Sequence, residues 1–341
     1  MSPNSNPRLG RRRILTLAAL SPLLLHNRSV AGEAVSVDQV LAGTPETGAR
    51  GFDIVDAQVH IRHGEIESTL AAMDALGIRS VMLDEFWGIM RETHPTHFEP
   101  GYQLPNGAWR AAWPTAELAS LLHPDRFAYL IRIDRRDPDL ESVMRTIVAS
   151  PQARAFRVQP VWTREDVADL AGGGYDDLLA LAQDLGLPVC FFIPGHVELL
   201  RPYIAKFPRL TFVIDHCGMG FPFIPLDQDP AAAQRTQAPA YLDEVLTLAE
   251  FPNVALKWSH AQDLFGVPAY PYEPLRPLLR KTLQAFGSER VMWASDHTVI
   301  PGHSWSDLLT SLRDDSELSP NEKAWLLGRA ARTIFQWPAA V

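Results

Sequence analysis

The stretch Asp56-Ala-Gln-Val-His60 closes an apolar run that begins at Phe52, and it indicates the end of a buried β-strand. Near the other end of the chain, Ala294-Ser-Asp296-His297 closes the run Arg290-Val-Met-Trp in the same way. The C-terminal ends of parallel barrel strands meet on one face, and the chemistry of such a fold lies there. We therefore expect these two polar strand ends to belong to one site.

Eight apolar runs alternate with amphipathic segments of helical period along the chain. Most of the runs are apolar throughout, which is typical of parallel strands that helices cover. Eight βα units in succession predict an α/β fold, a (β/α)8 TIM barrel, with residues 52–341 as one domain. The predicted strands are Phe52–His60, Ile78–Asp84, Phe127–Ile133, Ala153–Gln159, Leu187–Ile193, Leu210–His216, Asn253–Ser259 and Arg290–Ser295.

Residues 1–31 have the order of a signal peptide and are excluded from the fold prediction. Arg11-Arg12-Arg13 precedes the uncharged stretch Ile14–Leu25, and Ser29-Val30-Ala31 has the small-x-small pattern of a cleavage site. The arginine pair resembles a twin-arginine export signal, with an uncleaved anchor or a basic tail as the alternatives. We expect export to the periplasm, with residues 32–51 as a linker.

The charge of the chain argues against nucleic acid and anionic membranes as partners. Residues 1–31 hold five of the 31 basic residues and no acid, so the mature chain has 26 basic and 40 acidic residues, a formal charge of −14. No apolar run approaches the ~20 residues that span a bilayer. We expect a small-molecule substrate as the partner and leave a homo-oligomer open. Cys190 and Cys217 are expected to be buried free thiols.

The end of the first predicted strand is unusually polar. Side chains alternate along a strand, so Asp56, Gln58 and His60 share one face, which in a barrel is the interior. Burying polar groups costs several kcal/mol unless they are paired or used in function. His196, His216 and Asp296 follow other strands at the same end of the barrel. We expect His60, His196, His216 and Asp296 to surround one cavity.

Two further strand ends carry cations. Arg157 and Gln159 share a face at the end of the fourth predicted strand, as do Lys257 and Ser259 at the end of the seventh. Cations there suit a substrate carboxylate or a developing oxyanion. Asp215 has the opposite parity to His216, which favours a supporting role.

Other histidines and two long connections surround these strand ends. Residues 85–113 and 217–239 are expected to shape or cover the site, because long loops on this face commonly do so. The remaining histidines are each expected to be structural or at the surface; they are His94, His97, His260, His297 and His303.

Together these strand ends resemble the amidohydrolase-related barrel family, in the branch that contains lactonases and metal-dependent decarboxylases. The order and spacing of the motifs carry the resemblance, which runs from about Phe52 to Trp337. The motifs are Asp56-Ala-Gln-Val-His60, His196, Ile214-Asp-His216-Cys-Gly218, Val254-Ala-Leu-Lys257 and Val291-Met-Trp-Ala-Ser-Asp296.

In that family, strand one carries Asp-x-His-x-His, and a divalent metal is held by both His residues, a His of strand five and the Asp of strand eight. The resemblance implies His60, His196 and Asp296 as metal ligands, with zinc as the expected ion, and His216 as the group that polarises or protonates the substrate. Gln58 stands where the first His is expected, and glutamine is a poorer zinc ligand than imidazole. Replacing Gln58 by His is therefore expected to raise zinc affinity. One metal ion and a metal-free mechanism both stay open.

The predicted function is hydrolysis of a lactone or another ester-like C–O bond in a small carboxylated compound. Asp296 would act as the general base for water, and His60 and His216 would stabilise charge on the carbonyl oxygen. The alternatives are metal-dependent C–N hydrolysis or decarboxylation in the same pocket, and a periplasmic binding barrel that has lost its activity. The predicted substrate-binding residues are Gln58, Arg157, Gln159 and Lys257.

Overall fold

The computed structural model describes residues 51–86, 100–161, 163–220, 240–299 and 302–338. The chain divides into two units, Met1–Gly48 and Ala49–Val341, and the described residues belong to the second. The predicted signal segment and nearly all of the predicted linker lie outside the described residues. So do His94, His97 and most of the connection over residues 217–239.

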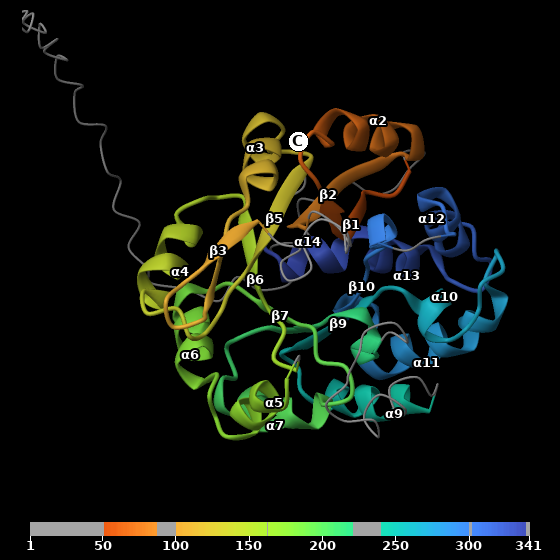
Figure 1. The fold of residues 1–341 in the computed structure, drawn as a ribbon. Helices are drawn as coiled ribbons and strands as arrows, with labels where there is room; N and C mark the ends of the chain where they lie inside the picture. Colours follow the sequence, from red (N-terminus) through yellow and green to blue (C-terminus); the bar gives the residue numbers. More distant parts are fainter. Residues whose placement is uncertain (1–50, 87–99, 162, 221–239, 300–301, 339–341) are drawn as a thin grey trace, which may run out of the picture. The chain divides into compact units, whose positions relative to one another are not determined.

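Eight parallel strands of the described chain form one sheet, and each corresponds to a predicted run. Their bounds are β1 (Ile54–Ile61), β2 (Ile78–Glu85), β5 (Phe127–Arg132), β6 (Ala153–Val158), β7 (Val189–Phe191), β8 (Phe212–Ile214), β9 (Val254–Trp258) and β10 (Val291–Trp293). Each strand pairs in parallel with the next in this order, so that β1 and β10 are the two edges (Figure 1).

Hydrogen bonds join the two edge strands. The Asp296 backbone N–H donates to the Gln58 carbonyl at 2.9 Å, and the Ser295 N–H donates to Asp56 Oδ1 at 2.8 Å. The sheet is thereby nearly closed into the predicted (β/α)8 barrel. The same bonds bring the first and last strand ends together, as the sequence predicts.

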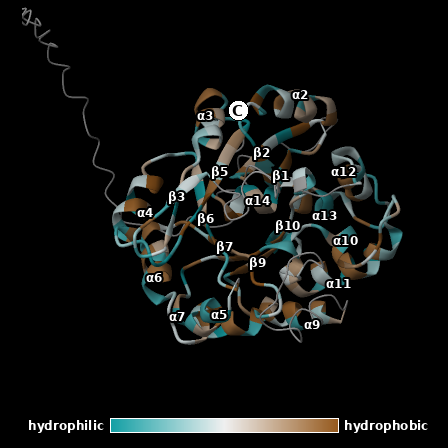
Figure 2. Cartoon of the chain, viewed as in Figure 1, coloured by the Kyte–Doolittle hydropathy of each residue, from teal (hydrophilic) through white to brown (hydrophobic). Residues whose placement is uncertain are grey.

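The helices between the strands are amphipathic, with polar and apolar residues side by side in Figure 2. Gly77 and Gly186 end two of them in the left-handed conformation, with φ of 73° and 74°. Among the described residues, every helix is too short or too polar to span a bilayer. The helices are α2 (Ile66–Leu76), α3 (Pro114–Leu122), α4 (Leu140–Val148), α5 (Arg164–Ala171), α6 (Asp176–Leu185), α7 (Arg201–Lys206), α9 (Tyr241–Leu246), α10 (Ala261–Leu264), α11 (Arg276–Phe286), α12 (Trp305–Arg313), α13 (Pro320–Ala324) and α14 (Ala330–Ile334).

Buried side chains along the strands alternate between two apolar clusters. The larger cluster faces the helices, and the smaller one lines the barrel interior with residues such as Ala128, Val213 and Met292. Phe335, just after α14, belongs to the interior cluster, and α14 contacts both edge strands (Figure 1). Apolar side chains therefore fill one end of the interior, and the polar strand ends lie at the other.

β1 departs from regular alternation. Its register against β2 shifts between Asp56 and Val59, so that β1 holds one extra residue there, as in a β-bulge. Asp56 consequently accepts hydrogen bonds from the Ser295 N–H at 2.8 Å and from Trp305 Nε1 of α12 at 2.7 Å. Trp305 belongs to the helix-facing cluster. The prediction that Asp56 shares a face with His60 is therefore wrong, because the bulge separates them.

The connection after β2 contains a hairpin that the strand prediction did not include. β3 (Gly101–Gln103) pairs in an antiparallel manner with β4 (Trp109–Ala111). Asn106-Gly107 lies between them, and Gly107 adopts a φ of 84°. Asn-Gly between two short strands is a strong hairpin signal, so the sequence did contain the information.

Candidate active site

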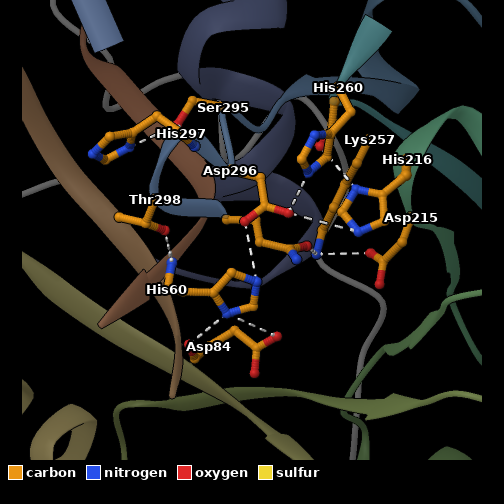
Figure 3. Close-up of polar contacts among 12 residues, drawn as sticks. His60, Asp84, Asp215, His216, Lys257, His260, Ser295, Asp296, His297 and Thr298 are labelled. Atoms are coloured by element: carbon orange, nitrogen blue, oxygen red, sulfur yellow. Dashed lines mark hydrogen bonds and ion pairs between the residues drawn. The ribbon is translucent and has the colours of Figure 1, made fainter. Parts of the chain in front are cut away.

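Four polar side chains converge at the C-terminal end of the barrel (Figure 3). Asp296 follows β10, and its Oδ1 lies 3.1 Å from Nε2 of His60 at the end of β1. Its Oδ2 lies 2.6 Å from His260 Nε2 and 3.7 Å from His216 Nε2. All four residues are buried. The structure thus brings together three of the predicted site residues and adds His260.

Three of these residues have an unusual backbone conformation. His216, His260 and Asp296 each adopt a positive φ, of 50°, 54° and 51°, two or three residues after the ends of β8, β9 and β10. A non-glycine residue in this region costs about 1–3 kcal/mol, and such strain gathers at functional sites. The repeated left-handed turn directs each side chain to the centre of the strand ends.

Hydrogen bonds fix the tautomers of two of the imidazoles. His60 Nδ1 lies 3.0 Å from the Asp84 carbonyl, so Nδ1 carries the hydrogen and Nε2 is the atom that faces Asp296. Arg157 Nη2 donates to His216 Nε2 at 3.2 Å, so His216 Nδ1 donates to Ser259 Oγ at 2.9 Å. Burial and the neighbouring His260 lower the pKa of His216 well below its ordinary value. His216 is therefore neutral.

Asp296 is ionised in this setting. Burial alone would raise the pKa of Asp296, but His60 and His260 hold it well below its ordinary value. Burial lowers the pKa of His260, but Asp296 and Asp263 raise it by more, so the net shift is upward. The Asp296–His260 contact is thus a charge-assisted pair, in which the imidazole holds Oδ2 of the carboxylate.

A network of buried charges lies beside this group. Arg157 Nε donates to Asp215 Oδ2 at 2.7 Å, and its Nη1 contacts Asp84. Lys257 Nζ lies 2.9 Å from Asp215 Oδ1 and donates to Gln58 Oε1 at 2.8 Å. Asp215 therefore has the supporting role expected from its parity, between two cations.

The predicted substrate-binding residues occupy different positions. Gln58, Arg157 and Lys257 are buried in the network just described, whereas Gln159 lies half-buried directly after β6. Their contact with a substrate stays a prediction.

The positions of His196 and His260 differ from those that the sequence predicted. His196 lies before the short 3₁₀ helix Val197–Leu200, and its Nδ1 is 3.9 Å from Glu198 Oε1. The group of possible metal ligands found among the described residues does not include His196, so its role as a strand-five ligand stays a prediction. His260, expected to be structural, is in that group. Parity did not indicate it, because the left-handed turn after β9 interrupts the alternation.

Three residues of this group could hold a divalent metal once His216 Nε2 releases the hydrogen bond from Arg157 and His260 Nε2 gives up its hydrogen. His216, His260 and Asp296 offer ligand atoms that all lie within 4.8 Å of one another. Asp296 Oδ1 is buried and accepts no hydrogen bond from the described residues, and it faces the nitrogen of His60 across 3.1 Å. A hydrogen on His60 Nε2 or a bound cation is needed between these two atoms. Two imidazoles and one carboxylate form a ligand set typical of catalytic zinc.

Comparisons with known proteins find several similar chains. The chain is 27% identical to the L-fucono-1,5-lactonase of Burkholderia ambifaria over 180 residues, and the match spans 50% of this chain and 56% of that one. A zinc-bound amidohydrolase from Burkholderia multivorans covers 84% of this chain and 99% of its own, with a TM-score of 0.61 and 17% identity. The 2,6-dihydroxybenzoate decarboxylase from Rhizobium has the same coverage, a TM-score of 0.51 and 14% identity.

At these identities the two solved structures show the barrel fold alone. The family model described as amidohydrolase matches residues 55–337, which include all eight barrel strands and the whole of the candidate site. The resemblance read from the strand ends is therefore confirmed, and this chain belongs to the amidohydrolase family.

Proposed function

We propose that this protein hydrolyses a lactone, or another ester-like C–O bond, in a small carboxylated compound. The observation that carries the proposal is the placement of an ionised Asp296 among His60, His216 and His260 at the C-terminal end of the barrel. The half-length match to an L-fucono-1,5-lactonase supports a sugar lactone as the first substrate to test.

The two oxygens of Asp296 would have separate tasks. Oδ2 is held by His260 at 2.6 Å, whereas Oδ1 accepts no hydrogen bond from the described residues. Oδ1 would take a proton from the attacking water while the water oxygen bonds to the acyl carbon. Collapse of the tetrahedral intermediate then breaks the ring C–O bond. The proton on Asp296 passes to the departing alkoxide, which restores the carboxylate.

Cationic and imidazole groups beside Asp296 would stabilise the negative charge that develops on the carbonyl oxygen. Arg157 Nη2 lies 3.2 Å from His216 Nε2, so a positive charge is close to the reacting group. Preorganised charge of this kind in a buried site is commonly the largest contribution to catalysis. Arg157, Gln159 and Lys257 would also favour a substrate that carries a carboxylate, with Gln58 as a further polar contact.

If a divalent metal is present, we propose that His216, His260 and Asp296 hold it, with His60 beside them and zinc as the first ion to test. Such an ion polarises a carbonyl oxygen and lowers the pKa of bound water. A metal-free reaction uses the same residues.

The test is hydrolysis of a lactone panel that includes L-fucono-1,5-lactone, followed by acid release at constant pH. We expect the wild type to open at least one lactone and Asp296→Asn to lose about 100-fold or more in kcat, the usual scale for loss of a general base. Asp184→Asn, at an exposed carboxylate, is the matched control. A wild-type rate in Asp296→Asn would assign the base elsewhere.

Decarboxylation is the second candidate function, because the ligand set around Asp296 can hold a metal. The same purified protein, with and without added zinc, would be tested for carbon dioxide release from hydroxybenzoates. Release of carbon dioxide together with no lactone opening would replace the first proposal by the second.

We also propose export through a twin-arginine signal. Arg11-Arg12-Arg13 followed by the apolar stretch Ile14–Leu25 supports it. Replacing Arg11 and Arg12 by Lys should keep the protein out of the periplasmic fraction. Equal amounts of variant and wild type in that fraction would contradict the proposal.

A further inference from the structure

The side chain of Lys257 contacts the residue that departs from the family pattern. Lys257 extends inward from β9 and is completely buried. Its ammonium donates to Gln58 Oε1 at 2.8 Å and lies 2.9 Å from Asp215 Oδ1 (Figure 3). The position where the first histidine of the strand-one pair is expected is therefore hydrogen-bonded to a cation.

The Lys257–Asp215 contact is an ion pair. Burial disfavours the charged form of Lys257, but Asp215 outweighs it, and the pKa of Lys257 is raised. Burial likewise disfavours the ionised form of Asp215, but Lys257 and Arg157 lower its pKa. The aromatic ring of Phe335 lies 5.9 Å from the ammonium and closes the space on its apolar side.

The arginine and lysine cations beside the site already have carboxylate partners without any added ion. Three cations contact three carboxylates directly or through His216; the cations are Arg132, Arg157 and Lys257, and the carboxylates are Asp84, Asp215 and Asp296. Bringing a divalent ion close to Lys257 would place an uncompensated charge beside a buried ammonium, where like charges repel strongly.

We propose that Lys257 is a built-in cation that keeps metal ions away from the strand-one side of the site, and that Gln58 and Lys257 act as a coupled pair. Any metal ion is then confined to the group of His216, His260 and Asp296. This proposal concerns ion binding, so it stands whether or not lactone hydrolysis is the reaction.

The proposal changes what is expected of Gln58→His alone. A histidine at position 58 would meet the N–H groups of the Lys257 ammonium at the place where Gln58 Oε1 now accepts. The imidazole lone pair would then accept that hydrogen bond and would not be available to a metal ion. Both residues must change before the strand-one side can bind a metal.

The experiment is a double-mutant cycle on zinc affinity. The proteins are the wild type, Gln58→His, Lys257→Gln and Gln58→His/Lys257→Gln, each stripped with chelator and titrated with zinc against a chromogenic chelator. Lys257→Gln removes the charge and keeps an amide that can donate to Asp215. The matched control is Lys281→Gln, which removes the same charge at an exposed ion pair with Asp243.

We expect each single variant to bind zinc within about threefold of the wild type and the double variant to bind it at least about tenfold more tightly than the wild type, a gain of about 1.4 kcal/mol in binding free energy. Bound zinc per protein, measured by elemental analysis, should rise only in the double variant. Lys281→Gln should match the wild type.

Two results would overturn the proposal. One is tight zinc binding by Gln58→His alone, and the other is a double variant that binds no more tightly than the better of its single variants. Circular dichroism checks that each protein is folded. If Lys257→Gln does not fold, Gln58→His/Lys257→Met replaces it, because Asp215 keeps the Arg157 guanidinium as a partner. Lactone hydrolysis by the wild type is measured separately, so failure of one proposal does not imply failure of the other.

Discussion

Asp296 Oδ2 lies 2.6 Å from His260 Nε2, and both residues adopt the left-handed backbone conformation two or three residues after the ends of adjacent strands, β10 and β9. The contact fixes one oxygen of the carboxylate and directs the other toward His60, at 3.1 Å. His260 Nδ1 in turn lies 3.9 Å from Asp263 Oδ2. His260 is therefore a positioning residue for Asp296 in the proposed reaction, even without a metal ion.

Replacing His260 should lower turnover more than substrate binding. We expect His260→Ala to reduce kcat by about 100-fold, because Asp296 loses the donor that orients it, with a smaller change in KM. His260→Gln should recover part of the loss, since its amide can still donate to Oδ2. The measurement is steady-state kinetics on the best lactone, with His123→Gln as a histidine control at the end of α3. Equal kcat in the wild type and His260→Ala would remove His260 from the site.

The fold could be predicted from the sequence because parallel barrel strands are buried on both faces. Such strands are apolar almost throughout, so all eight runs stand out between the amphipathic helices. The bulge in β1 could not be predicted, because one extra residue leaves the apolar composition of the strand unchanged. It nevertheless moves Asp56 to the face toward α12. The β3–β4 hairpin was missed for a different reason: its strands are short and not apolar.

The site could be predicted only as far as side-chain alternation holds. His60, Arg157 and Lys257 lie within strands, and alternation places them in the interior correctly. His260 lies beyond the end of β9, in a turn whose positive φ reorients the side chain. The two-residue alternation of a strand does not apply in such a turn, so it could not predict where the His260 side chain lies. Contacts between side chains of different strands could not be predicted either, because the sequence does not show that Lys257 contacts Gln58.

Arg157 should contribute strongly to stability, because it contacts both Asp84 and Asp215 in the barrel interior. Arg157→Met leaves each carboxylate with one cation, so we expect a loss of about 3 kcal/mol, at the lower end for a broken buried ion pair. Denaturant unfolding measures the change. Arg209→Met, at an exposed pair with Asp184, should leave the unfolding midpoint unchanged. A similar midpoint for both variants would mean that the buried network adds no stability.

The two cysteines should not react while the protein is folded. Cys190 and Cys217 are free and completely buried, as the sequence predicted, and burial raises the pKa of each thiol to about 12. The reactive thiolate is therefore almost absent at neutral pH. An aromatic disulfide reagent should detect no thiol in the native protein and two after unfolding in denaturant. Rapid reaction of either cysteine in the native state would show that the interior of the barrel opens.

Asp56 should make stability fall as the pH rises through the weakly acidic range. Burial raises its pKa from 3.8 to about 7, although the N–H groups of Ser295, Trp305 and Gln58 partly oppose the shift. Between these two values the folded state keeps a proton that the unfolded state has released, so each rising pH unit favours unfolding by about 1.4 kcal/mol. The total effect is about 4 kcal/mol, complete near pH 7 and absent below about pH 4.

Comparison with Asp56→Asn isolates this effect from that of every other titrating group. The amide cannot titrate. Its NH2 group either faces the Trp305 Nε1–H donor or leaves one N–H without an acceptor, so the variant loses stability by an amount that does not depend on pH. We therefore expect the free energy of unfolding of the wild type, minus that of the variant, to fall as the pH rises from 4 to 7 and then to stay level. Urea unfolding at half-unit pH steps measures both curves. A constant difference across this range would mean that Asp56 is ionised throughout, with its three N–H donors outweighing burial.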